Sequence, residues 1–137
     1  MPTPKNIFKA YDVRGIYPSE INEKIAARIA GVLTDYFKAK SKNPKIVIGR
    51  DTRLSSPALY QAVLDGVKRQ ASSVKIIEAG MITTPMLYFL VNHFKTAGGI
   101  MITASHNPKQ YNGLKAVSSE AAPISGKEIE RLIYGLR

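Results

Sequence analysis

Cysteine is the first residue type that this sequence lacks, and two other absences narrow the function further. Without cysteine the chain forms neither a disulfide framework nor a thiolate site. The N-terminus has no apolar segment of the kind that a signal peptide needs. The longest apolar run, MLYFLV at residues 86–91, is far too short to span a bilayer. The sequence therefore predicts a cytoplasmic protein with no membrane partner.

Acidic residues are scarce. The chain has 20 Lys and Arg against 10 Asp and Glu, for a formal net charge of +10. Such a balance suits nucleic acid, an anionic membrane surface or small phosphorylated ligands. The basic residues are scattered, with no run of four and no aromatic interleaving, so the pattern does not favour nucleic acid. The same imbalance is expected if the chain is one piece of a longer protein whose other parts carry the acids.

Two motifs of common catalytic sites are also missing. The aspartates are Asp12, Asp35, Asp51 and Asp65, and no two of them form the D-x-D loop that holds Mg²⁺. A metal site therefore needs ligands from outside this sequence. There is no G-x-S-x-G turn that would expose a strained serine nucleophile. A hydrolase-type nucleophile elbow is excluded by that absence.

What the sequence does have is an alternation of apolar strands and amphipathic helices. The chain is 137 residues long, the size of one ordinary domain. Cap residues and Pro at the first helical turn mark several helix starts. The predicted elements are a helix at 20–38 capped by Ser19, a strand at 45–49, a helix from Pro57 to Ala71 capped by Ser56, a strand at 74–80, a helix from Thr84 and Pro85 to Phe94, strands at 99–103 and 114–117, and a last helix from Ser125 to Tyr134.

This alternation predicts a three-layer α/β/α sandwich with a mainly parallel, mixed sheet. Residues 1–137 are expected to form a single domain of this kind. In such sheets ligands gather beyond the carboxyl ends of the strands. The polar loops at 49–57, 79–85 and 103–113 are therefore predicted to share one edge of the domain.

Ser105 and His106 stand at the start of the last of these loops, within the stretch GGIMITASHNPKQYNGLK at residues 98–115 that joins an apolar strand to the loop. A catalytic triad is excluded because adjacent side chains seldom point at each other. Phosphoryl chemistry remains, since there the nucleophile needs mainly exposure and positioning, and Lys115 and turn N–H groups could neutralise the charge. The alternative is an ordinary turn, because these residue types are common turn formers. Those residues are Ser105, Asn107, Pro108, Asn112 and Gly113.

Two Arg-containing segments carry the same ambiguity. In KAYDVRGIYP at residues 9–18, Arg14 suits a phosphate because its planar fork donates two hydrogen bonds. The alternative is an ion pair with Asp12. In GRDTR at residues 49–53, the cluster of Arg50, Asp51 and Arg53 either touches a ligand or, as we favour, braces its own loop.

Taken together, TASHNP at 103–108, NGLK at 112–115, FKAYDVRGIYP at 8–18 and GRDTRLSSP at 49–57 resemble a known family. They are similar, in the same order, to the N-terminal domain of the α-D-phosphohexomutases, in particular the phosphomannomutase/phosphoglucomutase branch. The likeness covers essentially the whole chain, and TASHNP is its most specific motif.

The resemblance implies a function. Ser105 would be the phosphoserine of a mutase in carbohydrate metabolism. The mutase would interconvert hexose 1-phosphate and hexose 6-phosphate, of glucose or mannose, through a 1,6-bisphosphate. Ser105 would also be an Mg²⁺ ligand through its phosphate. The resemblance gives catalytic roles to Ser105, His106, Lys115 and Arg14, and substrate binding to Tyr11, Arg14, Asn107 and Lys115. It assigns no general acid or base.

The departure from the family is length. Its members resemble four-domain proteins, with the metal, sugar and second phosphate loops in domains that this sequence does not contain. We therefore expect a first-domain fragment whose partners are a hexose phosphate and the remaining domains, and which alone has negligible mutase turnover. The alternative is a non-catalytic module that binds anions or nucleic acid through its basic surface.

Overall fold

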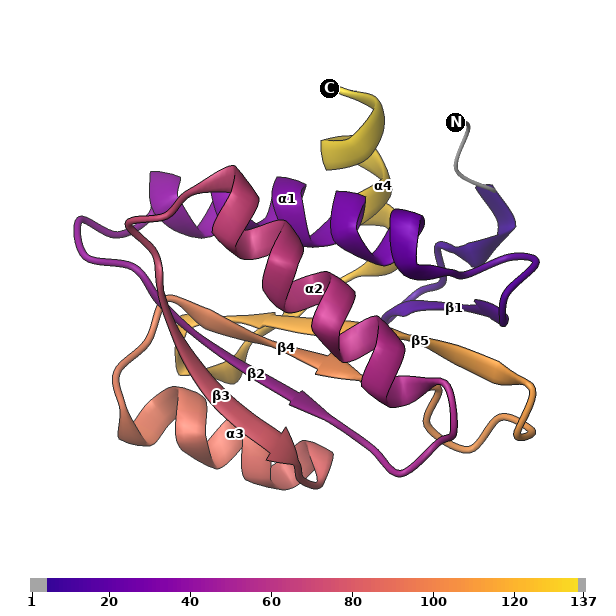
Figure 1. The fold of residues 1–137 in the computed structure, drawn as a ribbon. Helices are drawn as coiled ribbons and strands as arrows, with labels where there is room; N and C mark the ends of the chain where they lie inside the picture. Colours follow the sequence, from indigo (N-terminus) through magenta and orange to yellow (C-terminus); the bar gives the residue numbers. More distant parts are fainter. Residues whose placement is uncertain (1–4, 136–137) are drawn as a thin grey trace.

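A mixed sheet forms the middle layer of the structure, a computed structural model that describes residues 5–135 (Figure 1). Within those residues it has six strands in the order β1-β5-β4-β2-β3, with β6 paired to β5. Strand β2 is parallel to β3 and β4, whereas β5 is antiparallel to β4, β1 and β6. The strands are β1 (Val13–Ile16), β2 (Lys45–Arg50), β3 (Lys75–Met81), β4 (Gly98–Ile102), β5 (Tyr111–Ser118) and β6 (Pro123–Ile124).

Helices cover both faces of the sheet, which confirms the predicted α/β/α sandwich. Figure 1 shows α1, α2 and α4 on one face and α3 on the other. Short 3₁₀ turns precede β1 and follow β5. The helical elements are η1 (Lys5–Ile7), α1 (Glu23–Ala39), α2 (Ser56–Gln70), α3 (Thr84–His93), η2 (Ser119–Ala121) and α4 (Gly126–Tyr134).

The two faces of the sheet have separate cores because side chains alternate along each strand. In β2, Ile46 and Ile48 pack under α1 and α2, and Val47 packs against α3. Strand β4 does the same with Ile100 on one side and Met101 on the other. Each of these side chains is fully or almost fully buried, which stabilises the fold by about 1.5–3 kcal/mol per residue. Strand β4 is thus a fixed base for the loop that follows it.

Two helices have N-caps that differ from the predicted ones, and one of them, α1, also starts later than predicted. Helix α1 begins at Glu23, and the Asn22 side chain accepts a hydrogen bond from Ile25 N. Ser19 was the predicted cap, but residues 17–20 form a turn in which Glu20 N donates to Ile16 O. Helix α3 is capped by Thr83, whose Oγ1 accepts from Met86 N. In both helices the N-cap is a nearby polar residue and not the one that the sequence predicted.

The cap of α2 differs for a reason that bears on function. Ser55 occupies the N-cap position and Ser56 the first turn. The Ser56 hydroxyl donates to Asp51 Oδ1 instead of capping the helix. By contrast, Ser125 caps α4 as predicted and accepts from Glu128 N.

Strand β1 was not predicted at all. It pairs antiparallel with β5, which places Arg14 opposite Gly113. A Cβ at residue 113 would collide with the carbonyl group of Val13, so only glycine lets the two strands approach this closely. Strand β5 is itself longer than the predicted 114–117. Together these strands carry Arg14 to the carboxyl edge of the parallel strands.

No helix within residues 5–135 combines the length and the apolar character that crossing a membrane requires.

Candidate active site

The carboxyl ends of β2, β3 and β4 meet at one edge, on the right in Figure 1, where the β4–β5 loop also lies. The predicted sharing of this edge by three loops is therefore confirmed. Ile82 N donates to Arg50 O, which ties the loop after β3 to the end of β2. Asp51 N donates to Ile102 O, which ties the loop after β2 to the end of β4.

Ser105 lies three residues beyond the buried end of β4 and is exposed. Its φ angle is +57°, in the left-handed region that only glycine and a few polar residues enter readily. Ser105 N donates to Thr103 Oγ1 at 3.0 Å, and Asn107 N donates to Ala104 O at 3.1 Å. The loop therefore turns sharply at Ser105 and leaves its side chain accessible.

Arg53 connects the loop between β2 and α2 to the Ser105 loop, which comprises residues 103–111 between β4 and the start of β5. Its Nη2 donates to Ser105 O at 3.0 Å and to Asn107 O at 2.7 Å. Its Nη1 donates to Pro108 O at 2.7 Å and to Tyr111 O at 3.2 Å. The predicted bracing role of this cluster is confirmed for Arg53. Arg53 bonds to Asp51 within its own loop, as predicted, and it also braces the loop that carries Ser105, which the sequence did not indicate.

Asp51 and Asn112 hold the base of this arrangement. Asp51 accepts from Arg53 N at 3.1 Å and from Arg53 Nε at 3.2 Å, as well as from Ser56. The fully buried Asn112 donates to Ser55 Oγ at 2.7 Å and to Ser56 Oγ at 3.0 Å. Buried polar groups need such partners to offset their lost hydration. The start of α2 and the start of β5 are thus joined by side-chain hydrogen bonds.

Arg14 reaches the same loop from β1. Its Nε pairs with Asp12 Oδ1 at 2.9 Å, and its Nη1 donates to Asn107 Oδ1 at 2.6 Å. The ion pair left open as an alternative is therefore present. A guanidinium has five N–H donors. These two bonds use two of them, so three remain for a ligand as far as the described residues are concerned.

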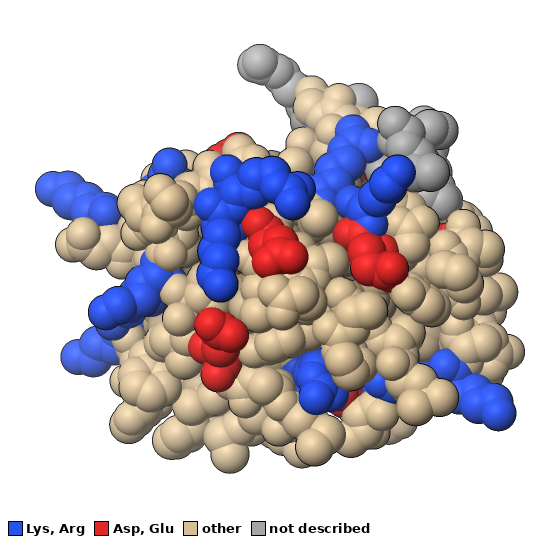
Figure 2. All heavy atoms as spheres, in the orientation of Figure 1, with Lys and Arg blue, Asp and Glu red and all other residues tan. Residues whose placement is uncertain are grey.

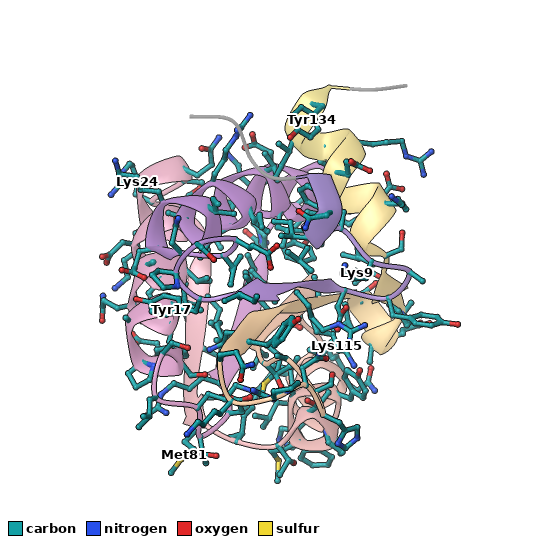
Figure 3. All side chains as sticks on the ribbon, turned by 90° about the vertical axis from the view of Figure 1, so that its right-hand side faces the viewer. Lys9, Tyr17, Lys24, Met81, Lys115 and Tyr134 are labelled. Carbon is teal, nitrogen blue, oxygen red and sulfur yellow. The ribbon has the colours of Figure 1, made fainter. Side chains whose placement is uncertain are left out.

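Among the described residues, the other predicted site residues take no part in these contacts. Lys115 is on β5 opposite Met101, so its side chain is on the α3 side of the sheet. Figure 3 looks onto the carboxyl edge and shows Lys115 between β1 and α3. Tyr11 is 72% exposed, and His106 is exposed. Within residues 5–135, Arg14 bonds directly to Asn107, and Arg53 links Ser105 to Asn107 through their carbonyl oxygens. No hydrogen bond joins Lys115, His106 or Tyr11 to these residues within the same range.

The same residues do not form a metal centre. Among the residues described, no three His, Asp or Glu side chains lie close enough together to hold an ion. Mg²⁺ prefers near-octahedral oxygen coordination. The site as it stands offers cationic and hydroxyl groups at the Ser105 loop, which suit a phosphoryl group better than a cation.

Comparison with known proteins agrees with this arrangement. Residues 5–136 match the family model for the phosphoglucomutase/phosphomannomutase alpha/beta/alpha domain I. Phosphohexose mutases of Xanthomonas campestris are 47% identical over 118 residues, which cover 86% of this chain and 25% of the relative. A phosphomannomutase of Salmonella typhimurium is 42% identical over 134 residues, which cover 95% of this chain and 28% of the relative. This chain thus spans little more than a quarter of the length of these relatives.

A solved structure has the same fold. It is a phosphoglucomutase/phosphomannomutase family protein from Burkholderia thailandensis, 31% identical, with a TM-score of 0.85. The match covers 98% of this chain and 30% of that one. Because the family model covers nearly the whole chain and the relatives match it closely in sequence, the chain belongs to the phosphoglucomutase/phosphomannomutase family, as its α/β/α domain I.

Proposed function

We propose that this chain is the phosphoserine-bearing domain of a phosphohexomutase. The parent protein would interconvert hexose 1-phosphate and hexose 6-phosphate through a hexose 1,6-bisphosphate. The observation that carries the proposal is the exposed Ser105 at the carboxyl edge, with Arg14 reaching its loop from β1. Family membership and the names of the relatives support it.

The proposed chemistry is two phosphoryl transfers. In the first, the bond between phosphorus and Ser105 Oγ breaks, and a bond forms between phosphorus and a free hydroxyl oxygen of the hexose monophosphate. The sugar hydroxyl loses its proton, and Ser105 Oγ gains one. In the second, the phosphoryl group at the other position returns to Ser105, with the opposite proton movements. Serine is regenerated as phosphoserine, so the net reaction is an isomerisation.

The described residues support this chemistry mainly by position and charge, which dominate phosphoryl transfer. Three N–H groups of Arg14 are available to phosphoryl oxygens. We assign His106 and Lys115 to the neighbourhood of the reacting oxygens, and Tyr11 and Asn107 to substrate contact. These assignments are predictions.

Other groups of the reaction belong to the parent protein. Mg²⁺, when bound, would neutralise phosphoryl oxygens, and the phosphate on Ser105 would contribute one ligand. The described residues form no metal centre of their own. We propose that the remaining ligands and the sugar-reading surface come from further domains, so that the 137-residue chain alone has negligible turnover.

The test uses the full-length parent. Phosphopeptide mass spectrometry is expected to locate phosphate on Ser105, and Ser105→Ala is expected to abolish conversion of glucose 1-phosphate or mannose 1-phosphate. Ser73→Ala, at an exposed position between α2 and β3, is the matched control and keeps wild-type turnover. Full activity in Ser105→Ala would refute the proposal.

The alternative, a module that binds nucleic acid, would use a different edge of the molecule. Lys40 and Lys42 follow α1, and Lys75 begins β3, so they lie at the amino ends of the strands, opposite Ser105. Figure 2 shows basic side chains gathered on this left-hand edge, whereas acidic residues are interspersed on the face toward the viewer. A triple Ala variant of these lysines would weaken salt-dependent RNA or DNA binding if the alternative holds, and would leave Ser105 phosphorylation intact.

A further inference from the structure

Arg53 has no hydrogen-bond donor left for a ligand. A guanidinium carries five N–H groups, and each has a partner within this protein. Nε donates to Asp51 Oδ2, while Nη1 and Nη2 donate to the carbonyl oxygens of four residues. Those residues are Ser105, Asn107, Pro108 and Tyr111.

The use of these donors separates Arg53 from Arg14. Arg14 keeps three donors and can bind a phosphate without breaking an existing contact. Arg53 would have to give up a carbonyl oxygen of the Ser105 loop for each phosphate oxygen that it gained. Its side chain is also only 13% exposed, whereas that of Arg14 is 30% exposed. The contacts thus point away from a phosphate ligand and toward a role in the loop itself.

The loop needs such support. Ser105 is in the left-handed region, which costs a non-glycine residue roughly 1–2 kcal/mol. The backbone bonds of Asn107 N to Ala104 O and Tyr111 N to Pro108 O are local turns that do not tie the loop to another element. A strained residue persists only where its surroundings determine its conformation. Here the four carbonyl contacts from Arg53 do so, beside the bond from Arg14 to Asn107 and the backbone bond from Tyr17 N to Gln110 O.

The position of Arg53 is itself fixed by hydrogen bonds to Asp51. Asp51 holds its Nε and its backbone N, and Ser56 donates to the same carboxylate. The buried Asn112 then ties Ser56 to the start of β5, where the Ser105 loop ends. The residues that hold the guanidinium are therefore bonded to both ends of the Ser105 loop, at Ile102 and at Asn112.

From this geometry we infer that Arg53 is a positioning residue that holds the Ser105 loop in the conformation needed for phosphoryl transfer. The link to phosphoryl transfer rests on the proposed function, whereas the support of the loop by Arg53 rests on the contacts alone. Arg53 acts through the backbone of the loop and does not touch the substrate. Lysine cannot replace it, because one ammonium has three donors and no planar fork to reach four carbonyl oxygens.

The first measurement is backbone amide exchange in the 137-residue chain. Arg53→Lys keeps the charge, and it is expected to speed exchange at Asn107 and Tyr111 on the order of tenfold or more, because these turns lose their support. Arg50→Lys is the matched control, since Arg50 makes a single bond to Asp51 O, and its loop exchange stays at the wild-type rate. Circular dichroism establishes that each variant is folded. If Arg53→Lys does not fold, Arg53→Gln is measured in its place.

The second measurement is steady-state kinetics of the full-length parent. A misplaced nucleophile lowers kcat, so Arg53→Lys is expected to reduce kcat on the order of 10²-fold with KM within about twofold of wild type. A raised KM at unchanged kcat would make Arg53 a substrate ligand and overturn the inference. Unchanged loop exchange would overturn it as well. A wild-type protein with neither turnover nor phosphate on Ser105 overturns the proposed function, and the exchange data still decide whether Arg53 holds the loop.

Discussion

Arg14 Nη1 lies 2.6 Å from Asn107 Oδ1, although the two residues are 93 positions apart in the chain. Strand β1 brings them together by pairing with β5 beyond the Ser105 loop. The amide oxygen of Asn107 thereby fixes one arm of the guanidinium and leaves the other arm for a ligand. Two segments that looked like separate motifs in the sequence form one site.

Asn107→Ala is expected to free that arm of Arg14. Loss of a hydrogen bond to a charged group corresponds to about 1.5–3 kcal/mol, so turnover of the parent at low substrate should fall about tenfold or more. Because the contact orients a residue predicted to bind phosphate, the loss is expected chiefly in KM. Steady-state kinetics measure this, with Asn43→Ala, at an exposed loop position, as the control. Wild-type kcat/KM in Asn107→Ala would contradict the role assigned to the contact.

Asn112→Ala is expected to destabilise the fold. The variant removes the acceptor of Gly113 N and the donor to the Ser55 and Ser56 hydroxyls, although Ser56 keeps its bond to Asp51. An unsatisfied buried polar group costs about 1–3 kcal/mol, so the free energy of unfolding in urea should fall by at least that amount. Asn92→Ala, at an exposed position on α3, should change it by less than about 0.5 kcal/mol. Equal effects of the two substitutions would show that the Asn112 contacts contribute nothing.

Gly113→Ala and Gly80→Ala test two different reasons why a position requires glycine: lack of space for a Cβ and a left-handed backbone conformation. At residue 113 a Cβ would collide with the backbone of β1, so the variant should displace β1 and Arg14. At residue 80, φ is +67° and a Cβ would meet nothing within 4 Å, so only the left-handed conformation opposes alanine. We expect a loss of about 1–2 kcal/mol for Gly80→Ala and a larger loss for Gly113→Ala, measured by urea unfolding. A larger loss of stability in Gly80→Ala than in Gly113→Ala would contradict this prediction.

Stability should fall in alkaline solution. Burial is the main cause that raises the pKa of Tyr60 and of Tyr88. Because the folded state holds these protons more tightly, their contribution is fully present below about pH 10 and is lost as pH rises through the raised pKa. The double variant Tyr60→Phe/Tyr88→Phe should therefore lose less stability than wild type between about pH 9 and 11. Tyr11→Phe, at a side chain that is 72% exposed, is the control and should keep the wild-type slope.

The layers of the fold could be predicted because apolar periodicity reports burial directly. Strands β2 and β4 are nearly continuous apolar runs, and α1 has a regular apolar stripe. Strand β1 escaped prediction for a physical reason. It is four residues long, and its alternation of buried and outward positions includes Gly15, which carries no side chain to signal burial. Its partner strand lies about a hundred residues later, outside any local pattern.

Sequence reasoning singled out Ser105, Asn107 and Arg14, but not the contacts that connect their segments. Arg53 was recognised as a bracing residue because it stands beside Asp51, yet its main partners are carbonyl oxygens of the Ser105 loop. Every residue has a carbonyl group, so no residue type marks such an acceptor. The role of Asn112 was hidden in the same way, since a polar residue next to glycine is typical of an exposed turn. Only the folded backbone distinguishes this buried asparagine from a surface one.

If Ser105 carries the phosphate, as proposed, its left-handed backbone places a strained residue where function needs a hydroxyl. Glycine would adopt a φ angle of +57° without strain, whereas alanine would retain the strain and lose the hydroxyl. Ser105→Gly should therefore be more stable than Ser105→Ala by about 1 kcal/mol, although both lack the phosphate acceptor. Under the proposed function, the substitution that relieves the strain also removes the phosphate acceptor, so a search for thermostable variants of this chain would select against the proposed activity.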